Sequence, residues 1–421
     1  MLKAETIVTQ KTYIMPFQMY LNNICNFKDE GAPVGVQDFS SESLTAARAY
    51  IYRVIKSYWT RICRNFTDTP PEIPPLPNCL DTLVSKETEC NDISASDFAR
   101  KLPSHYSLHS AYTLTGKYAS LLPPDTRSKY GIFYTPPSLT ERLLSSAGKQ
   151  GVNWRHCTVL DPACGGGAFL APVALRKQEA MPEASSKERI RIIGESLLGF
   201  EIDPFAGWLS QVLTELALIN DVINSEERLP TIFKTCDALR SPVEPSSFDL
   251  VVGNPPYGRT KLSEEDRSLY QRSLYGHANL YGLFTDLALR VAKPGGIIAL
   301  VTPASYLAGQ YFKNLRKTIR QLASPRQIDF VEKRNGTFDG VLQETVLSIH
   351  VKRQNPNVNH KTNVANVLKL QNNGFLKTEV AGKIYLPKKK GRPLDYSPDR
   401  TCGETAGPLK LKQVSFTRLR L

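Results

Sequence analysis

The sequence has no long apolar run and no recognisable leader segment. Its 421 residues contain no stretch of about 18 consecutive apolar residues, the length that a membrane-spanning helix requires. The first residues also lack the charged, apolar and small-residue segments of a secretory signal. The sequence therefore supports neither a membrane span nor secretion, and we expect no membrane partner and a cytoplasmic location.

Paired cysteines are absent as well. The eight cysteines are scattered, and no two of them form a CxxC pair: Cys25, Cys63, Cys79, Cys90, Cys157, Cys164, Cys236 and Cys402. This pattern fits reduced thiols better than a zinc site or a disulfide framework. We therefore expect no bound metal.

Acidic residues are too few to balance the basic ones. The chain has 53 Lys and Arg against 40 Asp and Glu, a formal net charge of +13. Residues 383–421 alone carry ten Lys or Arg against three Asp or Glu. A basic excess favours a polyanionic partner through counterion release, although many basic proteins bind no nucleic acid specifically.

Hydrophobic patterning divides the chain into three parts. Residues 1–125 form a helical N-terminal extension, with helices predicted over 43–66 and 107–122 and a proline-rich link over 67–77. Residues 126–353 alternate short Val, Ile and Leu runs with helical patterns, which predicts an α/β fold with a mostly parallel twisted sheet and helices on both faces. Residues 354–421 form a short basic C-terminal region. The predicted strands cover residues 157–163, 196–203, 231–238, 248–256, 296–303, 327–333 and 344–353.

Three successive predicted strands end in residues suited to a nucleoside. The first runs into the glycine-rich turn DPACGGGAFL, where the backbone at Gly165 and Gly167 can approach a ligand closely. The second ends at Glu201, which can accept hydrogen bonds from ribose hydroxyls, and the third at Asp237, which can accept from an adenine amine. Each feature alone fits a tight turn or a solvated acid. Together they predict a nucleoside pocket at the carboxyl edge of the sheet.

The fourth predicted strand delivers NPPY, Asn254 to Tyr257, to the same edge. Neither proline has an N–H, so the turn is rigid and its carbonyl oxygens are available as acceptors. An amide oxygen, a backbone carbonyl and a flat ring suit a planar aromatic amine, such as the exocyclic NH2 of a nucleobase. Holding both of its protons would direct the nitrogen lone pair toward an electrophile. A Pro-Pro turn with a packing tyrosine would also account for these four residues.

These motifs resemble a known family. DPACGGGAFL, GFEIDP, CDAL and NPPY, in that order, are similar to the S-adenosylmethionine-dependent N6-adenine DNA methyltransferases of restriction-modification systems. GIFYTPPSLTERLL before the glycine-rich turn and ANLYGLFTDLALRVAKPGGIIALVTPASYL after NPPY extend the resemblance, and the linear order is that of the gamma class. It covers residues 128–350, about half of the chain, and implies a Rossmann-like methyltransferase fold.

The resemblance also implies a role for each matching residue. Asn254, Pro255 and Pro256 would hold the target amine, while Tyr257 and Phe338 would stack on an adenine that has been flipped out of double-stranded DNA. The implied cofactor is S-adenosyl-L-methionine, and no metal takes part. The cofactor would contact Thr135, Asp161, Ala163, Gly165, Gly167, Glu201, Ile202, Asp237 and Asn254.

The sequence departs from the family after His350. Only about 70 residues follow, which is short for a domain that reads several base pairs. The sequence is compatible with a truncated recognition domain, with a separate specificity subunit or with a cognate restriction endonuclease as partner. The same motifs would also suit a methyltransferase of this fold that acts on guanine in RNA or glutamine in a protein, or a cofactor-binding remnant without catalysis.

Overall fold

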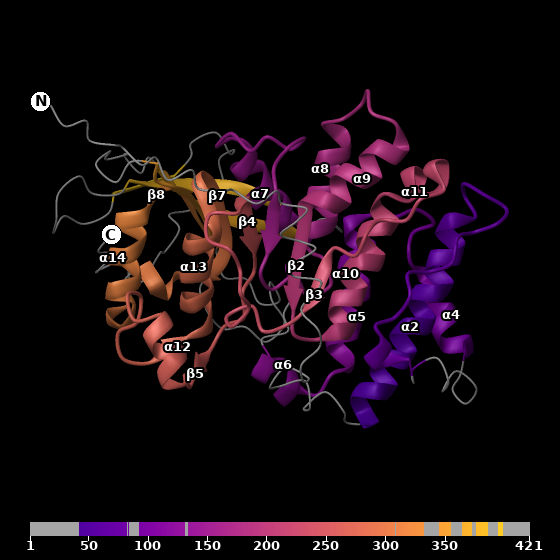
Figure 1. Ribbon diagram of the computed structural model, residues 1–421, viewed down its shortest axis with the longest axis horizontal. Helices are drawn as coiled ribbons and strands as arrows, with labels where there is room; N and C mark the ends of the chain where they lie inside the picture. The colour runs from indigo at the N-terminus through magenta and orange to yellow at the C-terminus, as the bar shows by residue number, and fades with distance from the viewer. Residues whose placement is uncertain are drawn as a thin grey trace, which may run out of the picture. The chain divides into compact units, whose positions relative to one another are not determined.

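A mixed β-sheet of ten strands runs through the described part of the chain (Figure 1). The computed structural model describes residues 42–81, 83, 92–130, 134–307, 309–331, 345–354, 364–372, 376–385 and 395–398. The strand order is β12-β11-β10-β8-β9-β7-β4-β1-β2-β3. The strands are β1 (Val159–Asp161), β2 (Leu197–Glu201), β3 (Phe233–Thr235), β4 (Phe248–Gly253), β7 (Ala292–Pro303), β8 (Ala323–Val331), β9 (Thr345–Lys352), β10 (Val364–Asn372), β11 (Leu376–Tyr385) and β12 (Asp395–Pro398).

The pairing of strands confirms the predicted fold class. Strands β3, β2, β1, β4 and β7 pair with one another in parallel, whereas β9 lies between β7 and β8 and is antiparallel to both. The parallel strands are apolar on both faces, as in the buried run Leu250–Val252 of β4. All seven strands predicted from the sequence are present in this arrangement.

Helices cover both faces of the sheet. Leu250 and Val252 of β4 join one hydrophobic cluster with residues of α7 (Pro137–Gly148), α8 (Leu170–Glu179) and α10 (Pro204–Ala217). The intervening Val251 is also buried, and it faces the opposite side because side chains alternate along a strand. Helix α13 (Leu280–Val291) packs against β4 and β7, and α14 (Lys313–Leu322) packs against α13 and β8.

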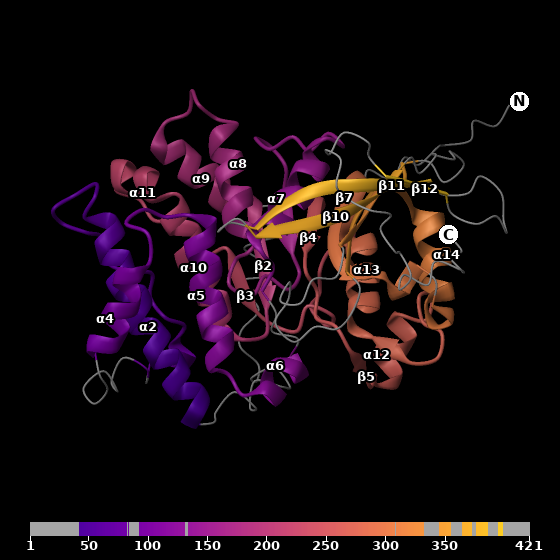
Figure 2. The ribbon, with the colours of Figure 1, turned by 180° about the vertical axis from the view of Figure 1, so that it is seen from behind.

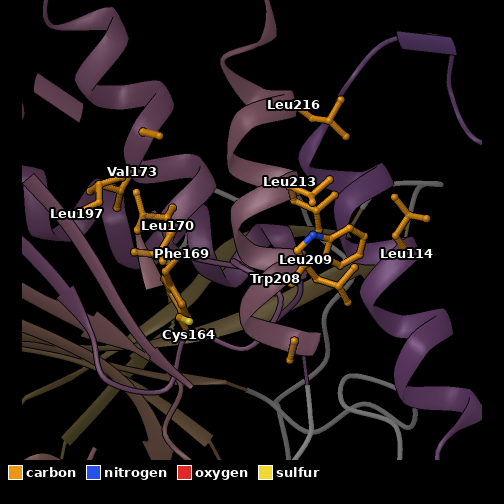
Figure 3. Close-up of a cluster of buried hydrophobic side chains, with 14 of the residues drawn as sticks. Leu114, Cys164, Phe169, Leu170, Val173, Leu197, Trp208, Leu209, Leu213 and Leu216 are labelled. Atoms are coloured by element: carbon orange, nitrogen blue, oxygen red, sulfur yellow. The ribbon is translucent and has the colours of Figure 1, made fainter. Parts of the chain in front are cut away.

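The N-terminal helices share this core. Helix α2 (Glu42–Cys63) and helix α5 (Leu108–Leu121) match the two helices predicted from the sequence, whereas α4 (Asp92–Lys101) was not predicted. The Tyr52 ring lies 5.5 Å from that of Trp208 in α10. Figure 3 shows Leu114 pointing from α5 toward Trp208 and Leu209, while Leu170 and Val173 of α8 pack near Leu197. The helical extension and the sheet therefore have one continuous hydrophobic core.

Strands β10–β12 continue the sheet past residue 353, where the apolar pattern weakens. Strand β10 is parallel to β8, and β11 and β12 follow as antiparallel neighbours; Figure 2 shows them from behind. Without β10, the outer edge of β8 would have unpaired backbone N–H and C=O groups. Backbone hydrogen bonds can therefore hold β10 there without a strong side-chain pattern. The division of the chain at residues 125 and 353 stays a prediction.

The remaining elements are short or peripheral. They are α6 (Pro124–Tyr130), α9 (Ser186–Ser196), α11 (Ile219–Ser225), α12 (Glu264–Leu269), the pair β5 (Arg259–Thr260) and β6 (Ala278–Asn279), and the 3-10 turns η2 (Asn78–Leu80), η3 (Ala304–Leu307) and η4 (Gln310–Phe312). Among the described residues, no helix has the length and apolar character needed to cross a membrane.

Candidate active site

A pocket of about 240 Å³ lies where β1, β2, β3 and β4 end. The loops after these four strands supply most of its wall, as expected for a ligand site in a parallel sheet. The structure thus brings together eight residues that were predicted separately from motifs spread over more than a hundred positions. They are Thr135, Ala163, Gly165, Glu201, Ile202, Asp237, Asn254 and Pro256.

Four other predicted residues that the structure describes do not line this pocket. Asp161 is fully buried beneath the glycine-rich turn, where its Oδ1 accepts a bond from the backbone N–H of Ala163 at 3.1 Å. Gly167 lies against α10, and a Cβ at this position would come within 3.0 Å of the Ser210 Cα. Pro255 is buried, and the hydroxyl of Tyr257 donates a hydrogen bond to the Oδ1 of Asn254. Phe338 lies outside the described residues.

Glu201 is held in place by the backbone around it. Its Oε2 accepts from the N–H of Gly165 at 2.9 Å, and its Oε1 accepts from the N–H groups of Ile202 and Asp203, both at 3.0 Å. Burial raises the pKa of Glu201 to about 7, although these backbone bonds favour the charged form. The carboxylate therefore ties the glycine-rich turn to the end of β2. This structural role could not be recognised from the sequence.

The glycines of the glycine-rich turn allow its backbone to pack closely against helix α5. Gly165 has a φ of +50°, a conformation that glycine adopts readily. A Cβ on Gly166 would lie 2.3 Å from the Cγ2 of Thr115 in α5. The glycine-rich turn is thus covered by the helical extension, which excludes larger side chains at this point.

Asp237 lies in the pocket wall just after the end of β3. Its Oδ1 accepts from the N–H of Leu239 at 3.0 Å, and its Oδ2 lies 3.8 Å from the Nε of Arg240. Arg240 also pairs with Asp266 of α12 at 2.8 Å. The loop after NPPY therefore contributes to the same wall, adding Leu262 and Tyr270 among other residues.

The NPPY side chains form a short hydrogen-bonded chain. The Nδ2 of Asn254 donates to the Oγ1 of buried Thr135 at 3.1 Å, and the Tyr257 hydroxyl donates to the Oδ1 of Asn254 at 3.0 Å. Burial raises the pKa of Tyr257, which keeps its hydroxyl a neutral donor. Its ring meets that of Tyr281 edge-on at 6.1 Å. The amide of Asn254 is thereby fixed at the wall of the pocket.

Asp203 belongs to a buried ionic network that sequence reasoning missed. Its Oδ1 accepts from the Nη2 of Arg48 at 2.8 Å, and its Oδ2 accepts from the Tyr118 hydroxyl at 2.6 Å. The side chains of Arg48 and Asp203 are only 5% and 2% exposed. Asp203 also caps α10 through the N–H of Phe205 and lines the pocket. Two helices of the extension therefore support the pocket directly.

Comparison with known proteins agrees with this geometry. Residues 197–337 match the family described as Eco57I restriction-modification methylase. The chain is 30% identical over 215 residues to the Type II methyltransferase M.TthHB8I of Thermus thermophilus, which covers 47% of this chain and 40% of that protein. It is 27% identical over 235 residues to M.BsuBI of Bacillus subtilis, covering 53% of this chain and 44% of that protein. The predicted resemblance to restriction-modification methyltransferases is confirmed.

Two solved structures of DNA-bound proteins share the fold. The Type ISP enzyme LlaBIII bound to DNA matches with a TM-score of 0.55 at 13% identity, over 85% of this chain and 29% of that chain. The DrdV–DNA complex matches with a TM-score of 0.51 at 14% identity, over 87% and 42%. The chain thus spans less than half the length of these two solved chains and of the two methyltransferase relatives.

Proposed function

We propose that the chain transfers a methyl group from S-adenosylmethionine to the N6 amine of a flipped-out adenine in double-stranded DNA. It would act as the modification part of a restriction-modification system, with a specificity subunit or a cognate endonuclease as possible partner. One observation carries the proposal: the acids at the ends of β2 and β3 and the amide of Asn254 share one pocket. The acids proposed to bind a nucleoside and the amide proposed to bind the target amine therefore line the same pocket.

The residues in the pocket fit the cofactor. Glu201 would accept from ribose hydroxyls, Asp237 from the adenine amine, and Ile202 would pack on the adenine ring. Three backbone N–H groups already donate to Glu201, so about one of its four acceptor positions stays open for a ligand. When bound, the cofactor supplies an electrophilic methyl group on its sulfonium.

The chain's own groups would prepare the target amine. The Oδ1 of Asn254 and the carbonyl of Pro255 would accept its two protons, and Tyr257 would stack on the base. This stacking would offset part of the few kcal/mol that base flipping costs. No covalent enzyme intermediate is required. Burial raises the pKa of Cys164 and raises that of Cys236 to about 11, which keeps both thiols protonated and unsuited as nucleophiles.

The raised pKa of Glu201 predicts a pH dependence of cofactor binding. The carboxyl is protonated below its pKa of about 7, and the ionised form is the better acceptor. We expect the affinity for S-adenosylmethionine to rise roughly tenfold between about pH 6 and about pH 8 and then level off. Titration calorimetry checks this. Glu201→Gln, which cannot ionise, should bind more weakly and show no such rise; a parallel rise in the variant would contradict the role of Glu201.

Incubation with labelled S-adenosylmethionine tests the proposed function. We expect the label to enter plasmid DNA, and digestion to nucleosides should recover it as N6-methyl-2′-deoxyadenosine. RNA and a protein mixture are offered in parallel reactions. Label in guanine of the RNA or in glutamine of the protein would replace the proposal with one of those substrates, and no transfer to any of the three would overturn it.

A further inference from the structure

Two exposed aromatic rings lie beside the first turn of α14. Tyr275 is 37% exposed and Tyr311 is 48% exposed, which is unusual for large rings. The Nζ of Lys313 lies 3.4 Å from the centre of the Tyr275 ring, and the ring of His277 lies 5.7 Å from that of Tyr311. Cation–π and ring contacts therefore link the loop at 274–277 to the start of α14.

The backbone holds these rings in fixed positions. Gly276 has a φ of +74°, and a Cβ there would come within 2.9 Å of the Tyr311 ring. The Nδ2 of Asn314 donates to the carbonyl of Leu274 at 2.5 Å, and the Thr318 hydroxyl donates to the carbonyl of Arg272 at 3.0 Å. The loop is thus tied to α14, so its rings are exposed but ordered.

Helix α14 adds a row of positive charges to the same surface. Its sequence KNLRKTIRQL contains four basic residues and no acidic one. Lys313, Lys317 and Arg320 are all exposed, and their spacing of four and three residues places them on one helix face. Lys317 and Arg320 form no ion pair with any residue that the structure describes. We name Tyr275, Tyr311, Lys313, Lys317 and Arg320 the α14 surface.

Ring contacts connect the α14 surface to the candidate catalytic loop. The ring of Tyr257 contacts that of Tyr281 at 6.1 Å, and Tyr281 contacts Phe312 at 5.1 Å. Phe312 is the immediate neighbour of Tyr311 and is buried. Two successive ring contacts therefore connect Tyr257, the residue proposed to stack on the target base, to the residue next to Tyr311 of the α14 surface.

We propose that the α14 surface binds the nucleic acid strand next to the target base, with its cations on phosphates and its exposed tyrosines on unstacked bases. Clustered exposed rings mark a binding site, and rings combined with cations suit nucleic acid better than an acidic protein surface. The inference rests on the proposed function, because it places the strand beside Tyr257, the residue proposed to stack on the target base. It assigns the binding contact to the α/β part rather than to the basic residues at 383–421.

Binding of a short fluorescent DNA duplex to the full chain, followed by anisotropy over a range of salt concentrations, tests this surface. We expect Lys317→Ala with Arg320→Ala to lower the affinity roughly 10- to 30-fold near physiological salt and to reduce the salt slope by about 2. Tyr311→Ala should weaken binding roughly fivefold or more, and Tyr311→Phe should restore it, because the phenyl ring still stacks.

The matched control is Lys187→Ala with Arg191→Ala on α9, which removes the same charge from two exposed positions four residues apart. Circular dichroism and cofactor affinity should be unchanged in every variant. Equal DNA affinity and salt slope in the two double variants would overturn the inference. Anisotropy does not require turnover, so failure of the α14 surface is distinguishable from failure of methyl transfer in the unmodified chain.

Discussion

Replacing Asn254 with alanine should lower the rate of methyl transfer by about two to three orders of magnitude while leaving the affinity for S-adenosylmethionine nearly unchanged. The lost amide oxygen is the proposed acceptor for the target amine, and removing one such preorganised group lowers turnover roughly 10²- to 10³-fold. Thr135 would lose the amide N–H that donates to its Oγ1, a bond outside the proposed contact with the target amine. Single-turnover transfer to plasmid DNA and calorimetry on the same preparation measure the two effects separately.

Two further variants make this result specific. Asn224→Ala removes an exposed asparagine of α11 and should leave both transfer and cofactor affinity unchanged. Thr135→Val keeps the shape of the threonine but removes the group that orients the amide, so it should reduce transfer less than Asn254→Ala. Near-normal turnover of Asn254→Ala would show that the NPPY turn has only a packing role.

Replacing Asp203 with alanine should lower the free energy of unfolding by about 3–5 kcal/mol. The change leaves the guanidinium of Arg48 buried without its counter-charge, removes the acceptor of the Tyr118 hydroxyl and deletes the N-cap of α10. Urea unfolding of the purified chain, followed by circular dichroism, measures the loss. Because Asp203 lines the pocket, cofactor affinity should fall with it.

The Arg191–Glu195 ion pair on α9 supplies the exposed control, since Glu195→Ala should cost less than about 1 kcal/mol. Combining Arg48→Met with Asp203→Leu should recover much of the stability that Asp203→Ala loses, because both charges are then absent. A loss below about 1 kcal/mol in Asp203→Ala would mean that water or another group compensates Arg48. The network would then not hold the extension against the pocket.

The sheet could be predicted because each of its strands has a recognisable pattern within its own short stretch of sequence. Runs such as FDLVVG are apolar on both faces and end in turn residues, so their type and order follow from the sequence alone. Helix α4 has the short, mostly polar sequence DISASDFARK, whose few apolar residues give no comparable signal. Strands β10–β12 were missed for a related reason, since they depend on the edge that β8 provides.

The candidate site was predictable where residues follow strand ends and unpredictable where distant side chains meet. Glu201, Asp237 and Asn254 each follow a strand of a parallel sheet, so the topology brings them to one edge. Arg48 carries no such signal, because its sequence neighbours resemble those of any amphipathic helix. The binding, catalytic and stacking roles of all the predicted site residues stay predictions.

The contacts between the helical extension and the pocket determine the order in which parts of the chain can fold during synthesis. Arg48 and Asp203 are separated by 155 residues, and the indole of Trp208 donates to the carbonyl of Pro74 across 134 residues. Helices α2 and α5 leave the ribosome long before α10 exists, so their apolar sides stay uncovered until α10 emerges. Apolar surface that is uncovered at that stage is prone to aggregation. The candidate pocket and the extension are consequently completed in the same late step.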